Sequence, residues 1–234
     1  MKKIVCFLWV LNICCNSLAQ NVSKIDKKIS SKSYYLNFSI TRTILIKPDK
    51  SRSETMYGSI FRNGGYIYSE SKFIKGIYED TLGIMIDDNF KMVNLFNNFS
   101  KSTILVNPFY DPAATIDYAL TYSNSKKNEM KNGNMVYDYF FSDSFAIKKI
   151  QVAENNKSDS FTIEITGQRL NEEVRDIITY KFLPDTVIRN APKISEYVEF
   201  KDGRYVQKPI LSEYDFLNST ALEELFKEIK KKSK

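Results

Sequence analysis

The chain has 234 residues, of which 43% are hydrophobic and 26% charged, and its formal net charge is +6. It contains no histidine, and its three cysteines and single tryptophan all lie within residues 6–15. Beyond that segment, a disulfide scaffold, a catalytic triad that uses histidine and the usual zinc sites are therefore excluded. Much of the positive excess lies in residues 227–234 and not in a basic stripe, so we expect no nucleic-acid partner.

The N-terminus has the three parts of a secretory signal peptide: a charged start, an apolar run at residues 4–15 and a small-residue end at residues 17–20. The apolar run has only 12 residues, whereas a membrane-spanning helix needs roughly 20. We therefore expect residues 1–20 to be a signal peptide that is cleaved after Ala19 or Gln20. Residues 21–234 are then a single exported domain. It would be periplasmic, or otherwise in the cell envelope or secreted, in a Gram-negative bacterium.

Lipidation of Cys14 or Cys15 is an alternative, and it would anchor the mature chain to a membrane. The residues that precede these cysteines, Ile13 and Cys14, are not the small residues that acylation normally follows.

A short amphipathic helix is predicted at residues 22–29, where Val22, Ile25 and Ile29 share one face. From Tyr34 the apolar period becomes two, which predicts a strand that ends before Pro48. The apolar face of this strand is formed by Leu36, Phe38, Ile40, Ile44 and Ile46.

Arg42 interrupts that apolar series. Three arrangements would explain this position. The guanidinium reaches water where the sheet curls outward, a β-bulge turns the side chain to the other face of the strand, or the side chain points into a cavity and binds a lid or a ligand head group. An open barrel accommodates each of these arrangements more easily than a dry sandwich core does.

Turn signals divide the next part of the chain into further strands. Asn63-Gly64-Gly65 predicts a tight hairpin turn. Asp87-Asp88-Asn89 separates strands predicted at residues 82–86 and 90–93, and another strand is predicted at residues 103–106. After the break at residues 107–112, the alternation through Tyr122 favours a strand, although residues 113–120 fit a helical turn equally well.

The polar segment at residues 123–134 is expected to be a loop or a lid. A capping box at residues 220–223 predicts a C-terminal helix, whose basic end can make transient contact with an anionic membrane surface. The remaining strands are predicted at residues 135–141, 145–152, 161–166, 177–183, 193–200 and 204–210.

Roughly ten or eleven short strands, with helices only near the ends, predict a mainly antiparallel β fold. The expected architecture is an unclosed β-barrel or a strongly curved sheet with short N- and C-terminal helices.

Carboxylates are the remaining chemistry, and the densest acidic positions are Glu79-Asp80 and Asp87-Asp88. Both fall at predicted turns, where Asp and Asn are expected for backbone reasons. We expect no enzyme activity, no cofactor and no metal site. A carbohydrate-active enzyme with two carboxylates is kept as a weaker alternative.

The order of signal peptide, short helix, alternating strand and the hairpin from Tyr57-Gly58 through Arg62-Asn63-Gly64-Gly65 resembles the LolA/LolB-like carriers of outer-membrane lipoproteins. The resemblance implies an unclosed β-barrel capped by helices, with an apolar cavity for lipid or lipoprotein acyl chains. It also implies an arginine that holds a lid closed, for which Arg62 matches by motif position and Arg42 by its inward face. The expected ligand-binding residues are Leu36, Phe38, Ile40, Arg42, Ile44, Ile60 and Arg62.

The alternative function is a protein–protein interaction module of the cell envelope, with a filled core and no ligand. A cavity large enough for an acyl chain favours the carrier, and a solid core with exposed aromatic edges favours the module.

Overall fold

The computed structural model describes residues 24–47, 50–79, 81–97, 111–155, 158–169, 172–184 and 191–218. The predicted signal peptide, the strand predicted at residues 103–106 and the predicted C-terminal helix lie outside these ranges.

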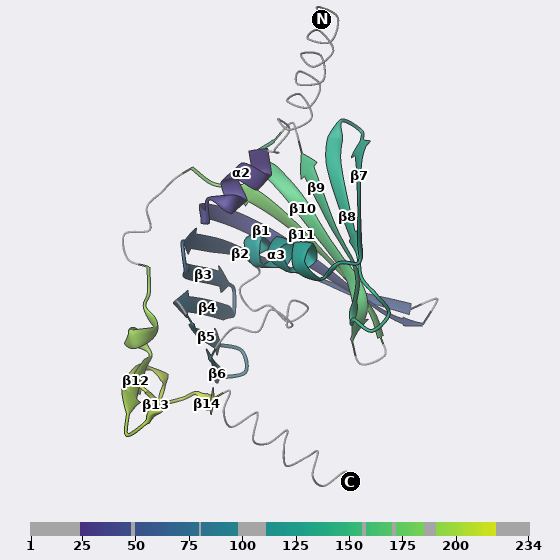
Figure 1. The fold of residues 1–234 in the computed structure, drawn as a ribbon. Helices are drawn as coiled ribbons and strands as arrows, with labels where there is room; N and C mark the ends of the chain where they lie inside the picture. The colour runs from purple at the N-terminus through teal and green to yellow at the C-terminus, as the bar shows by residue number, and fades with distance from the viewer. Residues whose placement is uncertain are drawn as a thin grey trace, which may run out of the picture.

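Most of the described chain belongs to one large curved sheet (Figure 1). Its twelve strands follow the order β14-β6-β5-β4-β3-β2-β1-β11-β10-β9-β8-β7, and the two end strands of that order do not pair with each other, so the sheet is not closed into a barrel. The strands are β1 (Ser33–Lys47), β2 (Lys50–Asn63), β3 (Tyr66–Ser71), β4 (Ile74–Glu79), β5 (Leu82–Asp87), β6 (Met92–Asn97), β7 (Ser125–Lys131), β8 (Asn134–Phe140), β9 (Ile147–Asn155), β10 (Ser160–Arg169), β11 (Glu172–Phe182) and β14 (Asp215–Asn218). This confirms the predicted unclosed, strongly curved β fold.

The predicted N-terminal helix is present as α2 (Lys24–Ser30), and it buries Ile25 and Ile29. The structure adds a second helix, α3 (Pro112–Tyr122), in the middle of the chain. Residues 113–120 therefore form the helical alternative and not the strand. The expectation that helices occur only near the ends of the chain is wrong. Asp111 caps the first turn and Pro112 has the fixed φ that suits a helix start, which overrides the alternation of apolar residues.

The predicted lid at residues 123–134 is also wrong, because most of it forms β7, which pairs with β8 through a turn at Asn132 and Gly133. As an edge strand, β7 is exposed on both sides. It therefore shows no alternation of apolar residues, and its lysines protect the edge from pairing with other chains.

The other corrections to the predicted strands are smaller. The strand expected from Phe90 begins at Met92, and β4 and β14 were not predicted; β14 pairs with β6 in parallel. The segment at residues 193–200 begins with the 3-10 helix η2 (Ile194–Glu196) before β12 (Val198–Lys201). The next strand, β13 (Arg204–Gln207), stops before η3 (Pro209–Leu211), because proline cannot continue the ladder.

The two faces of the sheet carry different cores. We call the face against which α2 and α3 pack the inner face, and the opposite one the outer face (Figure 1). The register of β1 places Leu36 opposite Ile60 on β2 and Phe38 opposite Tyr180 on β11, so these residues share the inner face. The inner cluster contains Ile25, Ile29, Tyr34, Leu36, Phe38, Ile40, Ile60, Ile67, Ala113, Tyr118, Ala119, Tyr139, Phe141, Ile147, Ile150, Val152, Phe161, Ile163, Ile165, Ile178 and Tyr180.

A second cluster lies on the outer face of the other half of the sheet. Phe61 neighbours Ile60 on β2 and therefore points outward, and the pairing runs from Phe61 through Tyr68 and Ile77 to Ile84 and Leu95. The outer cluster contains Ile77, Ile84, Ile86, Val93, Leu95, Ile194, Val198 and Leu211. Its last three members come from η2, β12 and η3, which cover this half of the sheet.

Candidate functional site: a groove beside α3

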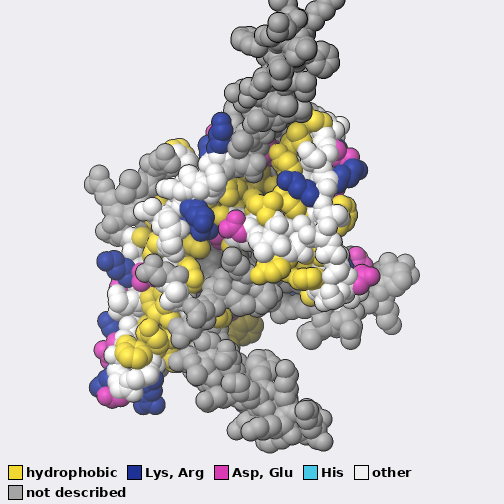
Figure 2. Space-filling model, viewed as in Figure 1, with side chains coloured by type: hydrophobic (Ala, Val, Ile, Leu, Met, Phe, Trp, Pro, Cys, Tyr) yellow, Lys and Arg dark blue, Asp and Glu magenta, His cyan; other side chains and the backbone are white. Residues whose placement is uncertain are grey.

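An apolar groove lies between α2, α3 and the strands β7, β8 and β9. It has a volume of about 270 Å³, just below the roughly 300–1,000 Å³ of typical small-molecule sites. Figure 2 shows hydrophobic side chains gathered between α2 and the β7–β8 hairpin, with basic side chains nearby. The groove is lined by Ile29, Ser30, Lys32, Ala113, Ile116, Asp117, Leu120, Lys126, Tyr137, Tyr139 and Val152.

One side of α3 forms a wall of this groove. Ala113, Ile116, Asp117 and Leu120 are spaced at i, i+3, i+4 and i+7, so they follow one face of the helix. Tyr118 and Ala119 lie on another side and are buried in the inner cluster. The helix therefore packs on the sheet with one side and leaves an apolar side open to the groove, where Leu120 is 58% exposed.

The N-terminus of α3 is fastened to the sheet by a buried polar cluster, the clasp, formed by Arg62, Asp111 and Tyr34. The Asp111 carboxylate accepts hydrogen bonds from the Arg62 guanidinium and from the Tyr34 hydroxyl. It also accepts one from the backbone N–H of Ala114, at 3.1 Å, as the helix cap. Arg62 in turn donates through Nε to the carbonyl oxygen of Gly64, at 3.2 Å. A single carboxylate thus joins β1, β2 and α3.

The clasp is nearly dry, since the side chain of Asp111 is 1% exposed and that of Arg62 is 11% exposed. Burial raises the pKa of the Tyr34 hydroxyl above its ordinary value, and the Asp111 carboxylate raises it further. Burial also raises the pKa of Asp111, while the Arg62 charge and the hydrogen bond from Tyr34 act in the opposite direction. The buried carboxylate therefore depends on Arg62 for its charge compensation.

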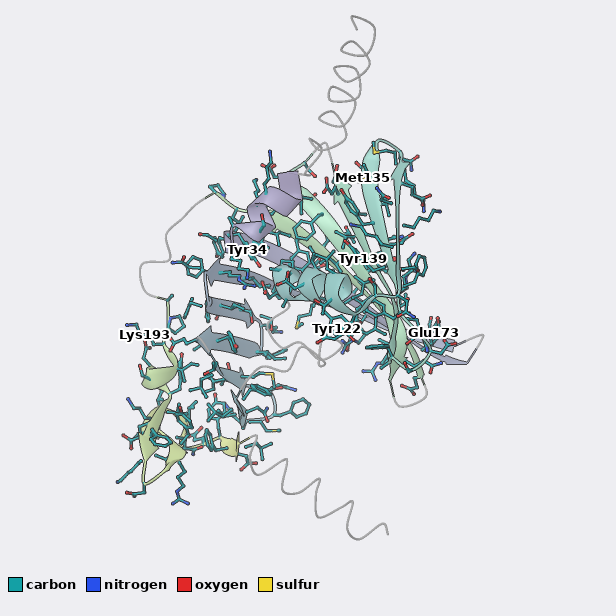
Figure 3. The ribbon with its side chains drawn as sticks, viewed as in Figure 1. Tyr34, Tyr122, Met135, Tyr139, Glu173 and Lys193 are labelled. Atoms are coloured by element: carbon teal, nitrogen blue, oxygen red, sulfur yellow. The ribbon has the colours of Figure 1, made fainter. Side chains whose placement is uncertain are left out.

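The C-terminal end of α3 is held by aromatic packing instead. Tyr118 stacks on Phe141 with ring centroids 5.5 Å apart, and it also contacts Tyr122 at 4.9 Å. Tyr122 and Phe141 both contact Phe145, in the connection between β8 and β9. Figure 3 shows Tyr34 and Tyr122 toward opposite ends of α3, and Tyr139 near the helix on the sheet. The groove runs along the helix between these two attachments.

Four of the apolar residues predicted to bind a ligand form the packed floor of the inner face. Leu36 and Ile60 are 0% exposed, and Phe38 and Ile40 are also buried. Ile44 is half-buried nearer the end of β1. None of these five lines the groove described above, so their role in ligand binding remains a prediction.

The two predicted arginines are in different environments. Arg62 belongs to the clasp at the start of α3. Arg42 makes a bidentate ion pair with Asp176 of β11, at 2.8 Å from Nε and 2.7 Å from Nη2. The pairing of β1 with both neighbours is regular through Arg42 and shifts only beyond Leu45, so the β-bulge explanation is wrong. The arginine stays on the inner face because its neighbour there is a buried carboxylate.

The acidic pair Asp87-Asp88 has structural partners in the turn between β5 and β6. The Asp87 carboxylate accepts hydrogen bonds from the backbone N–H groups of Asn89 and Phe90, at 2.9 and 3.0 Å. Asp88 accepts a hydrogen bond from the Tyr214 hydroxyl. These contacts fit the turn explanation for the acidic residues.

Sequence reasoning missed Asp111, Tyr34 and most of the groove lining. The available signal was Asp111-Pro112 followed by Ala113-Ala114, which has the form of a helix start with an N-cap and a first-turn proline. Nothing local in the sequence indicates that Asp111 meets residues 49 and 77 positions earlier in the chain.

Within the described ranges, no helix is long and apolar enough to cross a membrane. The same residues contain no cluster of three or more His, Cys, Asp or Glu side chains arranged to hold a metal ion.

Comparison with known proteins gives matches in structure alone. No family model and no curated protein matches the sequence. Among solved structures, the chain is similar to a LolA superfamily protein from Nitrosomonas europaea, with 10% identity, a TM-score of 0.37, and coverage of 70% of this chain and 91% of that one. It is also similar to a domain described as an outer membrane lipoprotein-sorting protein from Vibrio parahaemolyticus, with 9% identity, a TM-score of 0.35, and coverage of 71% and 94%.

Proposed function

We propose that this protein is an exported binding protein of the cell envelope that shelters an apolar chain, such as an acyl chain of a lipid or a lipoprotein, in the groove beside α3. The observation that carries the proposal is the open apolar side of α3, which faces Tyr137 and Val152 across the groove. Leu120 is exposed to solvent on this side of the helix. A bound chain that covers it removes apolar area from water, which stabilises the complex by about 25 cal/mol per Å².

The attachment of α3 suggests how the site changes size. The helix is held by the clasp at its start, by aromatic packing at its end and by the apolar side chains that it buries on the inner face. Apolar packing is non-directional, so it permits the helix to shift. We infer that displacement of α3 from the inner face enlarges the groove and exposes the apolar floor around Phe38 and Ile40. Release of the chain then follows contact with a membrane or a partner that competes for it.

The test is native mass spectrometry of the full chain, expressed with its own N-terminal segment in a Gram-negative host and purified without detergent. The protein mass reports whether residues 1–20 are removed. A reproducible added mass of a fatty acid, phospholipid or other acylated molecule is expected. A protein that remains bare after incubation with phospholipid vesicles would overturn the proposal.

Two matched variants on α3 locate the ligand. Leu120→Glu places a carboxylate in the groove and is expected to reduce the ligand-bound fraction at least about tenfold, because a charge is costly to bury against an acyl chain. Thr121→Glu adds the same charge at the next, exposed position outside the groove lining and should retain the ligand. Equal occupancy in both variants would show that the chain binds elsewhere.

A further inference from the structure

The groove is apolar along its length and carries cationic side chains at its margins. Lys32, directly after α2, and Lys126, on β7, both line it. Besides its lysines and tyrosines, the lining has two polar side chains, Asp117 of α3 and Ser30 of α2. Two lysines and one aspartate among the lining residues leave the groove with a positive balance of side-chain charge beside its apolar residues.

Lys126 is oriented toward the groove by the strand register. It lies opposite Tyr139 of β8, and its ammonium group sits 5.0 Å from the ring centroid of Tyr137 and 5.3 Å from that of Tyr139. Contact with the ring faces keeps the charge near the groove without neutralising it, since a cation–π contact supplies no formal negative charge. The neighbouring Lys127 points to the opposite face of the strand.

Lys32 reaches the margin from an unusual backbone position. Its φ is +51°, in the left-handed region where a helix most often ends with glycine. The turn is fixed by the Lys32 N–H, which donates to Ile29, and by the Lys32 carbonyl, which accepts from Gly64, at 3.0 and 2.8 Å. Glycine would adopt this conformation at lower conformational cost, so the side chain of Lys32 can be removed without straining the turn.

From these observations we infer that the ligand is a single-chain amphiphile with an anionic head, whose chain enters the groove and whose head binds Lys32 and Lys126. This inference rests on the proposed function. With α3 in place, the volume of about 270 Å³ is below that of typical small-molecule sites, so the groove holds at most one chain. The two lysines select a carboxylate or phosphate over a neutral or zwitterionic head.

The experiment is a calorimetric titration of the full chain with amphiphiles that carry lauroyl chains, the single-chain ones kept below their micelle concentrations. The probes are laurate, lauroyl lysophosphatidylglycerol, lauroyl lysophosphatidylcholine and dilauroyl phosphatidylglycerol in nanodiscs. We expect both anionic single-chain probes to bind about tenfold more tightly than the zwitterionic one, the scale of two partly exposed ion pairs. Laurate and the lysophosphatidylglycerol together show whether a carboxylate or a phosphate is preferred.

Lys126→Gln and Lys32→Gly should each lower the affinity for the anionic probes about threefold and leave lysophosphatidylcholine binding unchanged. Because glycine suits the backbone at position 32, Lys32→Gly should fold at least as stably as the parent, which separates loss of charge from loss of structure. Lys127→Gln, on the opposite face of β7, is the matched control and should bind all probes as the parent does.

The outcomes separate the inference from the proposed function. Equal affinity for anionic and zwitterionic single chains, or tighter binding of the diacyl lipid, would overturn the inference while the proposed function stands. Binding of none of the probes, with a bare protein in native mass spectrometry, would overturn both. A preference for anionic heads that survives both lysine substitutions would place the head elsewhere and overturn the assignment to Lys32 and Lys126.

Discussion

The inner and outer clusters of the same sheet are covered in different ways. Over the outer cluster, the cover formed by η2, β12 and η3 is joined to the sheet by hydrogen bonds at both of its ends. β14 pairs with β6, the Asp215 N–H donates to Lys91 at 2.8 Å, and the Tyr66 hydroxyl donates to the carbonyl oxygen of Pro192 at 2.7 Å.

Over the inner cluster, α3 contacts the sheet through apolar side chains and is joined to it by hydrogen bonds at its start, in the clasp. Apolar packing is non-directional, so a helix can shift on an apolar surface more easily than a strand can leave a ladder. The outer cover leads directly into strand β14 of the sheet, whereas α3 packs on an apolar surface. Under the proposed function, α3 is therefore the element that moves for a ligand.

The largest expected effect comes from breaking the clasp. Arg62→Met leaves the Asp111 carboxylate buried without its charge partner, and we expect a loss of about 3–5 kcal/mol in the free energy of unfolding. Urea denaturation measures it. The double variant Arg62→Met/Asp111→Asn should recover part of the loss, because asparagine still caps α3 and carries no charge. A loss below about 1 kcal/mol for the single variant would mean that the clasp does not hold α3.

Truncation in the outer cluster should affect stability without affecting the ligand. Ile84 is 0% exposed, and Ile84→Ala is expected to cost about 2–5 kcal/mol through lost burial and a cavity. Native mass spectrometry of the folded variant should show the same ligand occupancy as the parent. Reduced occupancy would show that the two faces of the sheet are coupled.

The floor of the inner face can be perturbed at Gly58, which lies opposite Phe38. A Cβ atom at this position would stand 2.4 Å from both the carbonyl oxygen of Glu70 and Cζ of Phe38. Gly58→Ala must therefore move the ring or the strand, and we expect a loss of about 1–3 kcal/mol. Ser59→Ala, at the next position on the outer face, should stay within about 0.5 kcal/mol of the parent in the same denaturation experiment.

Alkaline pH should lower the free energy of unfolding, because the ionisation of Tyr34 weakens the clasp. The pKa of Tyr34 is raised in the folded chain, so its contribution is complete below pH ~10, the pKa of an unfolded tyrosine, and declines as the pH rises above it. The expected decline is about 1.4 kcal/mol per pH unit from this residue. Tyr34→Phe should remove that part of the slope in denaturation experiments at several pH values, and an unchanged slope would contradict the assignment.

Much of the fold could be predicted from local patterns, because a half-buried strand alternates apolar and polar residues along the sequence. β1 follows from alternation, and the β2–β3 hairpin at Asn63-Gly64-Gly65 follows from turn chemistry. β7 could not be predicted in this way, since an edge strand exposed on both faces has no apolar period. For α3, Asp111-Pro112 gave a helix start and Tyr118 to Tyr122 gave a strand-like alternation, and only packing against the inner cluster decides between them.

The sequence by itself determined a curved β-rich chain with a predicted signal peptide, and it singled out Arg42 and Arg62 as the unusual charges. Only the tertiary structure decided what each arginine does, because the partner of each guanidinium lies on a distant part of the chain. Asp176 stands beside Arg42 through the pairing of β1 with β11, 134 residues apart, and Asp111 reaches Arg62 because α3 folds back over the sheet. The groove likewise exists only where α2, α3 and β7–β9 meet, and no contiguous stretch of the chain encodes it.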